Sequence, residues 1–153
     1  MKIYYRTLLI ALAFSFAIGI LSHVTTFLTR LYPYPNDYQA IATNSILLSI
    51  IGMIISPVLL FVTFYYIGKK PETIGEFYSH LLSFFIGNLI GFALGNFLGT
   101  FSTVIEMPFE YVAYLFLFSF VGSPFSSSFF VGFSALAISY IIKKNKKPNN
   151  AQA

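Results

Sequence analysis

The sequence contains no cysteine and few charged residues. Without cysteine the chain has no disulfide framework, no thiolate metal site and no catalytic thiol. Only 9% of its 153 residues are charged, whereas a soluble domain carries about 25% charged residues. Because 57% of the residues are hydrophobic and the mean hydropathy is +0.77, water is not the expected solvent around most of this chain.

Long runs without Lys, Arg, Asp or Glu determine the expected class. They cover residues 7–29, 38–68, 77–105 and 111–142, and each exceeds the roughly 20 apolar residues that cross a bilayer as a helix. We therefore expect an all-α integral membrane protein, a bundle of four transmembrane helices in a single domain over residues 1–142. The predicted spans are about 7–29, 39–67, 77–103 and 112–142.

The basic residues indicate an orientation. Eight of them precede the first span, separate the second from the third or follow the fourth: Lys2, Arg6, Lys69, Lys70, Lys143, Lys144, Lys146 and Lys147. Only Arg30 lies on the other side. Because loops rich in Lys and Arg stay in the cytoplasm, both termini are predicted to be cytoplasmic, most simply in the cytoplasmic membrane of a prokaryote. Residues 143–153 then form a basic, polar cytoplasmic tail.

Local signals predict where helices end and begin. Gly68 is expected to be a C′ glycine that ends the second span. Thr73 and Glu76 have the spacing of a capping box that opens the third. The fourth run is longer than the membrane requires, and residues 122–124 (Gly-Ser-Pro) are predicted to kink it. A re-entrant segment at residues 108–124 is the alternative.

Small residues recur at helical spacing and predict close helix packing. The third span carries glycine at every fourth position, at Gly87, Gly91, Gly95 and Gly99, and other spans contribute Gly19, Gly52 and Gly132. Such stripes let helix backbones approach closely in lipid, either within one chain or between subunits. His80, Phe84 and Asn88 fall on or beside the glycine face. The opposite face is expected to meet lipid and contains Leu82, Ile86, Leu89, Ala93 and Phe97.

Catalytic and metal-binding constellations are absent from the predicted spans. No acidic or basic side chain lies in a span core, so proton relays and charge-coupled transport lack their usual groups. His23 and His80 differ by roughly 24 Å in depth at 1.5 Å per residue, too far to share a metal within one subunit. We therefore expect no enzyme, no cofactor and no metal.

A few polar residues are expected near the outer side of the membrane. They suggest a small polar cleft and are His23, Asn96, Ser123, Ser126 and Ser127. The alternative is a buried hydrogen-bond cluster that satisfies the backbone groups freed by Pro124.

These patterns favour a non-enzymatic, multi-pass membrane protein, structural or accessory, that packs with itself or with a larger membrane complex. The alternative is a small channel or transporter that passes a neutral or anionic solute through the outer polar residues. The expected partners are the lipid bilayer and other membrane subunits or further copies of the chain, and no nucleic acid. Four lysines are expected to contact lipid headgroups: Lys143, Lys144, Lys146 and Lys147.

Overall fold

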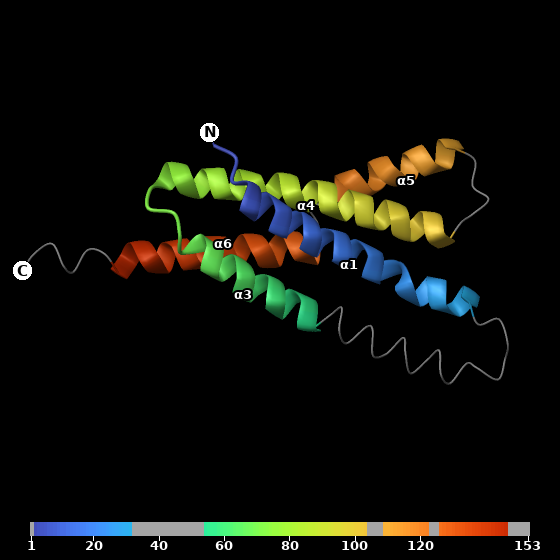
Figure 1. Cartoon of the computed structure of the whole chain (residues 1–153), viewed down its shortest axis with the longest axis horizontal. Coiled ribbons are helices and arrows are strands. Elements are labelled where there is room, and N and C mark those ends of the chain that lie inside the picture. The colour runs from blue at the N-terminus through green and yellow to red at the C-terminus, as the bar shows by residue number, and fades with distance from the viewer. Residues whose placement is uncertain (1, 32–53, 104–108, 123–125, 147–153) are drawn as a thin grey trace, which may run out of the picture.

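The computed structural model describes residues 2–31, 54–103, 109–122 and 126–146 (Figure 1). All regular elements in these ranges are helices: α1 (Tyr5–Leu31), α3 (Ser56–Gly68), α4 (Ile74–Thr103), α5 (Phe109–Gly122) and α6 (Ser127–Lys146). The prediction of an all-helical chain is confirmed for these residues. The predicted first and third spans fall within α1 and α4, whereas the first part of the second span lies outside the described residues.

The helices associate as two parallel pairs. Helix α1 packs along α4, and α3 packs along α6. In the first pair the facing residues advance together along both helices: Leu8 with Gly87, Leu12 with Gly91 and Phe16 with Gly95. In Figure 1 α1 and α4 run from left to right, while α3 and α6 run from right to left. The starts of α1 and α4 and the ends of α3 and α6 therefore gather at one end of the bundle.

The glycine stripe of α4 is covered by α1. A Cβ atom added at Gly87, Gly91 or Gly95 would overlap a backbone carbonyl oxygen of α1. Only glycine permits two helix backbones to approach this closely, which is how small residues promote helix association in lipid. Of the two arrangements expected from the stripe, the structure has packing within the chain, and α1 occupies this face of α4.

Other predicted packing glycines also lie at helix contacts. A Cβ atom on Gly19 would lie 2.9 Å from the backbone nitrogen of Asn96. Gly132 faces the ring of Phe84, and Gly99 is buried. Gly52 lies outside the described residues. Three helices, α1, α4 and α6, therefore contribute a small residue where a neighbour comes close.

Gly68 has a different role from the predicted one. It is the last residue of α3, and Lys69 after it keeps right-handed geometry with φ −78° and ψ −15°. No described glycine has a positive φ, so the prediction of a left-handed C′ glycine is wrong. A Cβ atom on Gly68 would instead lie 2.6 Å from the carbonyl oxygen of Leu136. This glycine is needed because α6 crosses α3 there.

The start of α4 follows the capping prediction in part. The Thr73 hydroxyl oxygen accepts a hydrogen bond from the Glu76 N–H at 3.2 Å. The Glu76 carboxylate accepts from the N–H of Glu72 at 2.7 Å, one residue earlier than a capping box requires. The α4 end of the short α3–α4 turn is thus fixed by local hydrogen bonds.

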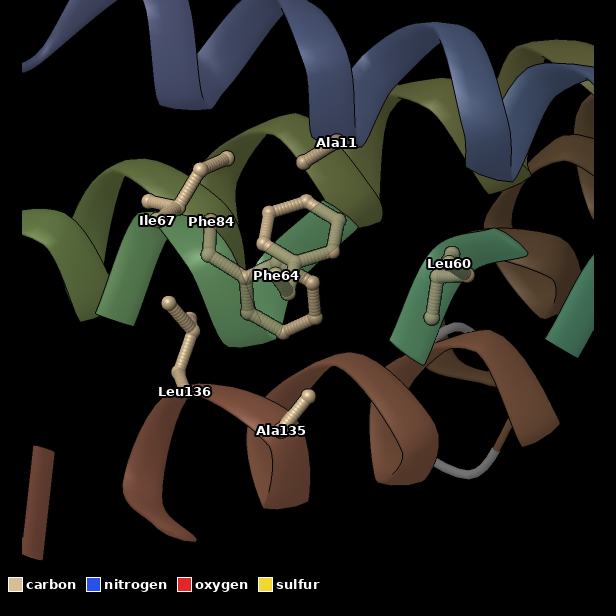
Figure 2. Close-up of a cluster of buried hydrophobic side chains, with 7 residues drawn as sticks. All are labelled: Ala11, Leu60, Phe64, Ile67, Phe84, Ala135 and Leu136. Atoms are coloured by element: carbon tan, nitrogen blue, oxygen red, sulfur yellow. The ribbon is translucent and has the colours of Figure 1, made fainter. Parts of the chain in front are cut away.

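The apolar core lies where the two helix pairs meet. Its fully buried members come from four helices, and Figure 2 shows the rings of Phe64 and Phe84 at its centre. The two rings meet edge to face with centroids 4.8 Å apart. The cluster consists of Ala11, Leu60, Phe64, Ile67, Phe84, Ala135 and Leu136. The aromatic pair thereby joins α3 to α4 and places both helix pairs around one core.

The predicted lipid face of α4 is only partly exposed. Ala93 was expected to face lipid, and this is wrong because its side chain is fully buried. Helix α4 packs against α1, α5 and α6, and the Phe64 ring of α3 also contacts it, so little of its circumference is left uncovered. A wheel drawn for α4 alone cannot anticipate that α5 returns along the same helix.

The fourth predicted span is divided into α5 and α6 on either side of residues 123–125, which lie outside the described residues. Both helices run from right to left in Figure 1, so the chain keeps its direction across this segment. Among the described residues, one stretch, Ile74–Gly99, is long and apolar enough to cross a membrane, and Tyr5–Leu21 and Ser56–Gly68 are shorter apolar helices. Because core helices of soluble proteins also reach this length, the number of spans stays a prediction.

Replacement of Gly91 by alanine is expected to destabilise the α1–α4 pair. The added methyl group meets the Leu12 carbonyl, and overpacking of this kind costs about 1–3 kcal/mol. The matched control is Gly75→Ala in the first turn of α4, where the added methyl group would meet only the Thr73 hydroxyl, 4.0 Å away, so no overpacking is expected. Unfolding of both variants in detergent, followed by circular dichroism, measures the difference. Equal stability of the two variants would contradict the close α1–α4 contact.

Candidate functional site

Most of the buried polar side chains in the described residues form two groups between the helices. The first, the central cluster, joins α1, α4 and the start of α6. The Asn88 side-chain oxygen accepts hydrogen bonds from the hydroxyls of Ser15 at 2.6 Å and Ser128 at 3.0 Å. The hydroxyls of Ser128 and Ser126 are 2.9 Å apart. Because a buried amide without partners is costly, these bonds allow Asn88 to remain almost fully buried.

The second group, the end cluster, lies where α1 and α4 begin. The Thr7 hydroxyl is hydrogen-bonded to His80 Nδ1 at 2.8 Å. The Tyr4 N–H donates to the Ser83 hydroxyl at 2.8 Å, and the Tyr4 ring stacks on the His80 ring with centroids 3.9 Å apart. The residues before α1 are therefore held against the first turns of α4.

One helix register produces both clusters. Thr7 and Ser15 are eight residues apart on α1, and His80 and Asn88 are eight apart on α4. Positions separated by four or eight residues share one helix face. The two helices run parallel, so both polar pairs form together, with the buried Ala11 and Phe84 between them in sequence.

A pocket of about 340 Å³ opens beside the end cluster. It is bounded by the start of α1, the α3–α4 turn and the first turns of α4, and it carries charges of both signs. Its lining consists of Tyr4, Arg6, Thr7, Ile67, Lys70, Pro71, Glu72, Glu76 and His80. Such a mixed lining suits a small polar ligand with both positive and negative groups.

Lys143 at the end of α6 braces one wall of this pocket. Its ammonium group donates to the carbonyl oxygens of Pro71 at 2.8 Å and Lys70 at 3.3 Å. It also forms an ion pair with the Glu72 carboxylate at 2.6 Å. The predicted headgroup lysine is therefore engaged within the chain, whereas Lys144 and Lys146 are exposed and Lys147 lies outside the described residues.

The residues of the predicted outer cleft are described only in part. Ser126 is buried and belongs to the central cluster with Ser128 and Asn88. Asn96 is partly exposed, and its backbone lies against Gly19 of α1. Ser123 and the side chains of His23 and Ser127 lie outside the described residues. A cleft made by all five stays a prediction.

Sequence reasoning missed the partners of these polar residues. Thr7 continues the four-residue stripe of Ala11, Ser15 and Gly19, a signal that could have been read. Asn88 and His80 were placed beside the glycine face, but a wheel shows only which way a residue faces on its helix. It does not identify the helix that lies opposite.

The described residues offer polar groups that could bind a ligand. No group of three His, Cys, Asp or Glu side chains there could hold a metal ion. Thr7 and His80 pair a hydroxyl with an imidazole, as nucleophilic catalysis requires. However, Thr7 is only 2% exposed at the floor of the pocket, which hinders the approach of a substrate carbonyl.

Comparison with known protein families, characterised proteins and solved structures finds no match to this chain.

The central cluster predicts coupled effects of substitution. Ser15→Ala is expected to lower the free energy of unfolding by about 0.6–1.7 kcal/mol, the range for hydrogen bonds between membrane helices. In an Asn88→Ala background the same change should have almost no effect, because the acceptor is already absent. The control is Ser134→Ala on the exposed side of α6. Additive losses in a double-mutant cycle, measured by unfolding in detergent, would refute the bond between Ser15 and Asn88.

Proposed function

We propose that this chain is a multi-pass membrane protein with four spans and both termini in the cytoplasm. The observation that carries the proposal is the distribution of polar and apolar side chains. Large apolar side chains cover the outside of the described helices, among them Leu9, Val58, Leu59, Val62, Leu117, Phe118, Val121, Phe130, Ile138 and Ile141. A soluble monomer rarely exposes contiguous apolar patches beyond a few hundred Å², and hydrocarbon is the solvent that suits this surface.

The interior is correspondingly polar. Among the buried polar residues, Ser15, Ser83 and Ser139 have no exposed surface, and Asn88 is 1% exposed. In lipid, helices gain little from apolar contact and associate through small residues and hydrogen bonds. A surface richer in large apolar groups than the interior supports a membrane environment and argues against water as the surrounding solvent.

The end of the bundle where α1 and α4 begin collects basic residues. Arg6 and Lys70 line its pocket, and Lys69, Lys143 and Lys146 lie around a neighbouring depression. The Lys69 ammonium lies over the Tyr65 ring, 4.4 Å from its centroid. Because loops rich in Lys and Arg remain in the cytoplasm, the gathering of these residues supports a cytoplasmic location for this end.

The exposed apolar surface of α5 supports a structural or accessory role. The described polar groups in the centre bond to one another, and α1 fills the glycine face of α4. Helix α5 packs on α4 and leaves apolar side chains uncovered, including Phe118 at 79% exposure. We infer that the chain is non-enzymatic and that this surface packs on further copies or on a larger membrane complex.

The orientation is tested by cysteine labelling, which the absence of native cysteine makes unambiguous. In intact cells a membrane-impermeant maleimide should label Asn36→Cys, in the predicted outer loop, and spare Asn145→Cys near the end of α6. Permeabilised cells should label both. Release of the protein by an alkaline wash of membranes, or labelling of Asn145→Cys from outside, would overturn the proposal.

The accessory role predicts an assembly larger than one chain. Extraction in mild detergent, followed by light scattering corrected for detergent, should give a protein mass well above the 17.2 kDa of the monomer. Replacement of Phe118 by serine should shift the particle toward the monomer, whereas Ser134→Ala should not. A monomer that passes a neutral or anionic solute when reconstituted would favour a channel or transporter instead.

A further inference from the structure

The pocket beside the end cluster contains two cations that form no ion pair with a described carboxylate. Within the described residues the one ion pair joins Lys143 to Glu72, so Glu72 is already compensated. Arg6 and Lys70 line the pocket, and no described carboxylate lies within salt-bridge distance of either cation. Glu76 completes the set, with its carboxylate bonded to the N–H of Glu72.

These charges define the ligand chemistry. Two cations in the lining of one pocket favour a phosphate, for which arginine and lysine are the usual partners. The carboxylate of Glu76 in the same lining disfavours a purely anionic ligand and favours one that also carries a hydrogen-bonding cation. A volume of about 340 Å³ lies at the lower end of the range for small-molecule sites, about 300–1,000 Å³, and suits a headgroup more than a whole lipid.

The side chains around the pocket suit a headgroup that carries acyl chains. Leu9, one turn after Arg6 on α1, is 60% exposed, and Tyr66, one turn before Lys70, is 64% exposed. Exposed apolar and tyrosine side chains next to the cations are typical of the level where lipid headgroups meet hydrocarbon. Acyl chains joined to a headgroup in the pocket would continue along this apolar surface.

We propose that the pocket binds the phosphoethanolamine headgroup of a membrane lipid. Arg6 and Lys70 hold the phosphodiester, and Glu76 accepts a hydrogen bond from the primary ammonium group. A quaternary ammonium cannot donate this bond, and a headgroup without an amine leaves Glu76 beside a second negative charge. The proposal rests on the membrane location proposed above, and it adds a specific ligand.

The test uses the full chain in detergent and native mass spectrometry with three lipids of identical acyl chains. Phosphatidylethanolamine is expected to bind about tenfold more tightly than phosphatidylcholine or phosphatidylglycerol. A tenfold difference in Kd corresponds to about 1.4 kcal/mol of binding free energy. Arg6→Gln should reduce binding of phosphatidylethanolamine about tenfold by the same conversion. The matched control, Lys144→Gln, removes an exposed cation from α6 outside the pocket lining and should leave binding unchanged.

A second variant tests recognition of the ammonium group separately from recognition of the phosphate. Glu76→Gln retains an acceptor for the Glu72 N–H, so the start of α4 should persist, as circular dichroism can verify. This variant should lose the preference for phosphatidylethanolamine over phosphatidylcholine while still binding phosphatidylglycerol. Equal binding of all three lipids by the unmodified chain, or a preference unaffected by Arg6→Gln and Glu76→Gln, would overturn the proposal.

Free phosphoethanolamine distinguishes the source of the headgroup. If the pocket binds a lipid, the soluble compound should compete only at concentrations far above that of the lipid. Competition at equal concentration would refute a lipid as the source of the headgroup and would indicate a soluble ligand of the same chemistry. A chain that cysteine labelling places in the membrane, but that does not discriminate among lipids, would refute this site alone. A chain released by the alkaline wash would refute the membrane location itself.

Discussion

The close contact between α1 and α4 is the constraint on which the other packing depends. Carbonyl oxygens of Leu8, Leu12 and Phe16 lie where side chains on the α4 glycines would otherwise be. This contact fixes the parallel register of the two helices, and the register brings Thr7 to His80 and Ser15 to Asn88. Each interhelical hydrogen bond is weak. Together the bonds favour one register, because a shift of α1 along α4 by one helical turn would separate Thr7 from His80 and Ser15 from Asn88 at once.

Polar and apolar side chains are placed in the opposite way to those of a soluble helix bundle. Hydroxyl, amide and imidazole groups lie between the helices, and large apolar side chains lie outside. Within the described residues, the part of the interior around Phe64 and Phe84 resembles an ordinary hydrophobic core. Glycines and hydrogen bonds dominate the contact between α1 and α4. Aromatic packing and the hydrogen bond between Ser128 and Asn88 join this pair to α3 and α6.

Much of the helical content could be predicted from the sequence, because charge-free runs bounded by charged residues mark where apolar helices begin and end. The glycine face of α4 was also evident from spacing. The helix opposite that face was not, since Gly91 meets Leu12 across a contact that no local pattern encodes. The role of Gly68 was also missed, because the sequence does not show that Leu136 of α6 lies against this glycine. The pocket was missed for the same reason, since it joins Arg6 to Lys70 and Glu76 from segments far apart in the sequence.

Lys143 has a consequence for the order in which the protein is completed. It reaches back across 73 residues to the carbonyl oxygen of Lys70 and braces the turn between α3 and α4. A chain is synthesised from its N-terminus, so this lysine emerges after all the described residues that line the pocket. Helices α1 and α4 can associate earlier, whereas the wall formed by Pro71 and Glu72 gains its support only when α6 arrives. A chain that stops before Lys143 would keep the α1–α4 contact and lose the bonds to Lys70, Pro71 and Glu72, so the wall of the pocket depends on the end of the last helix.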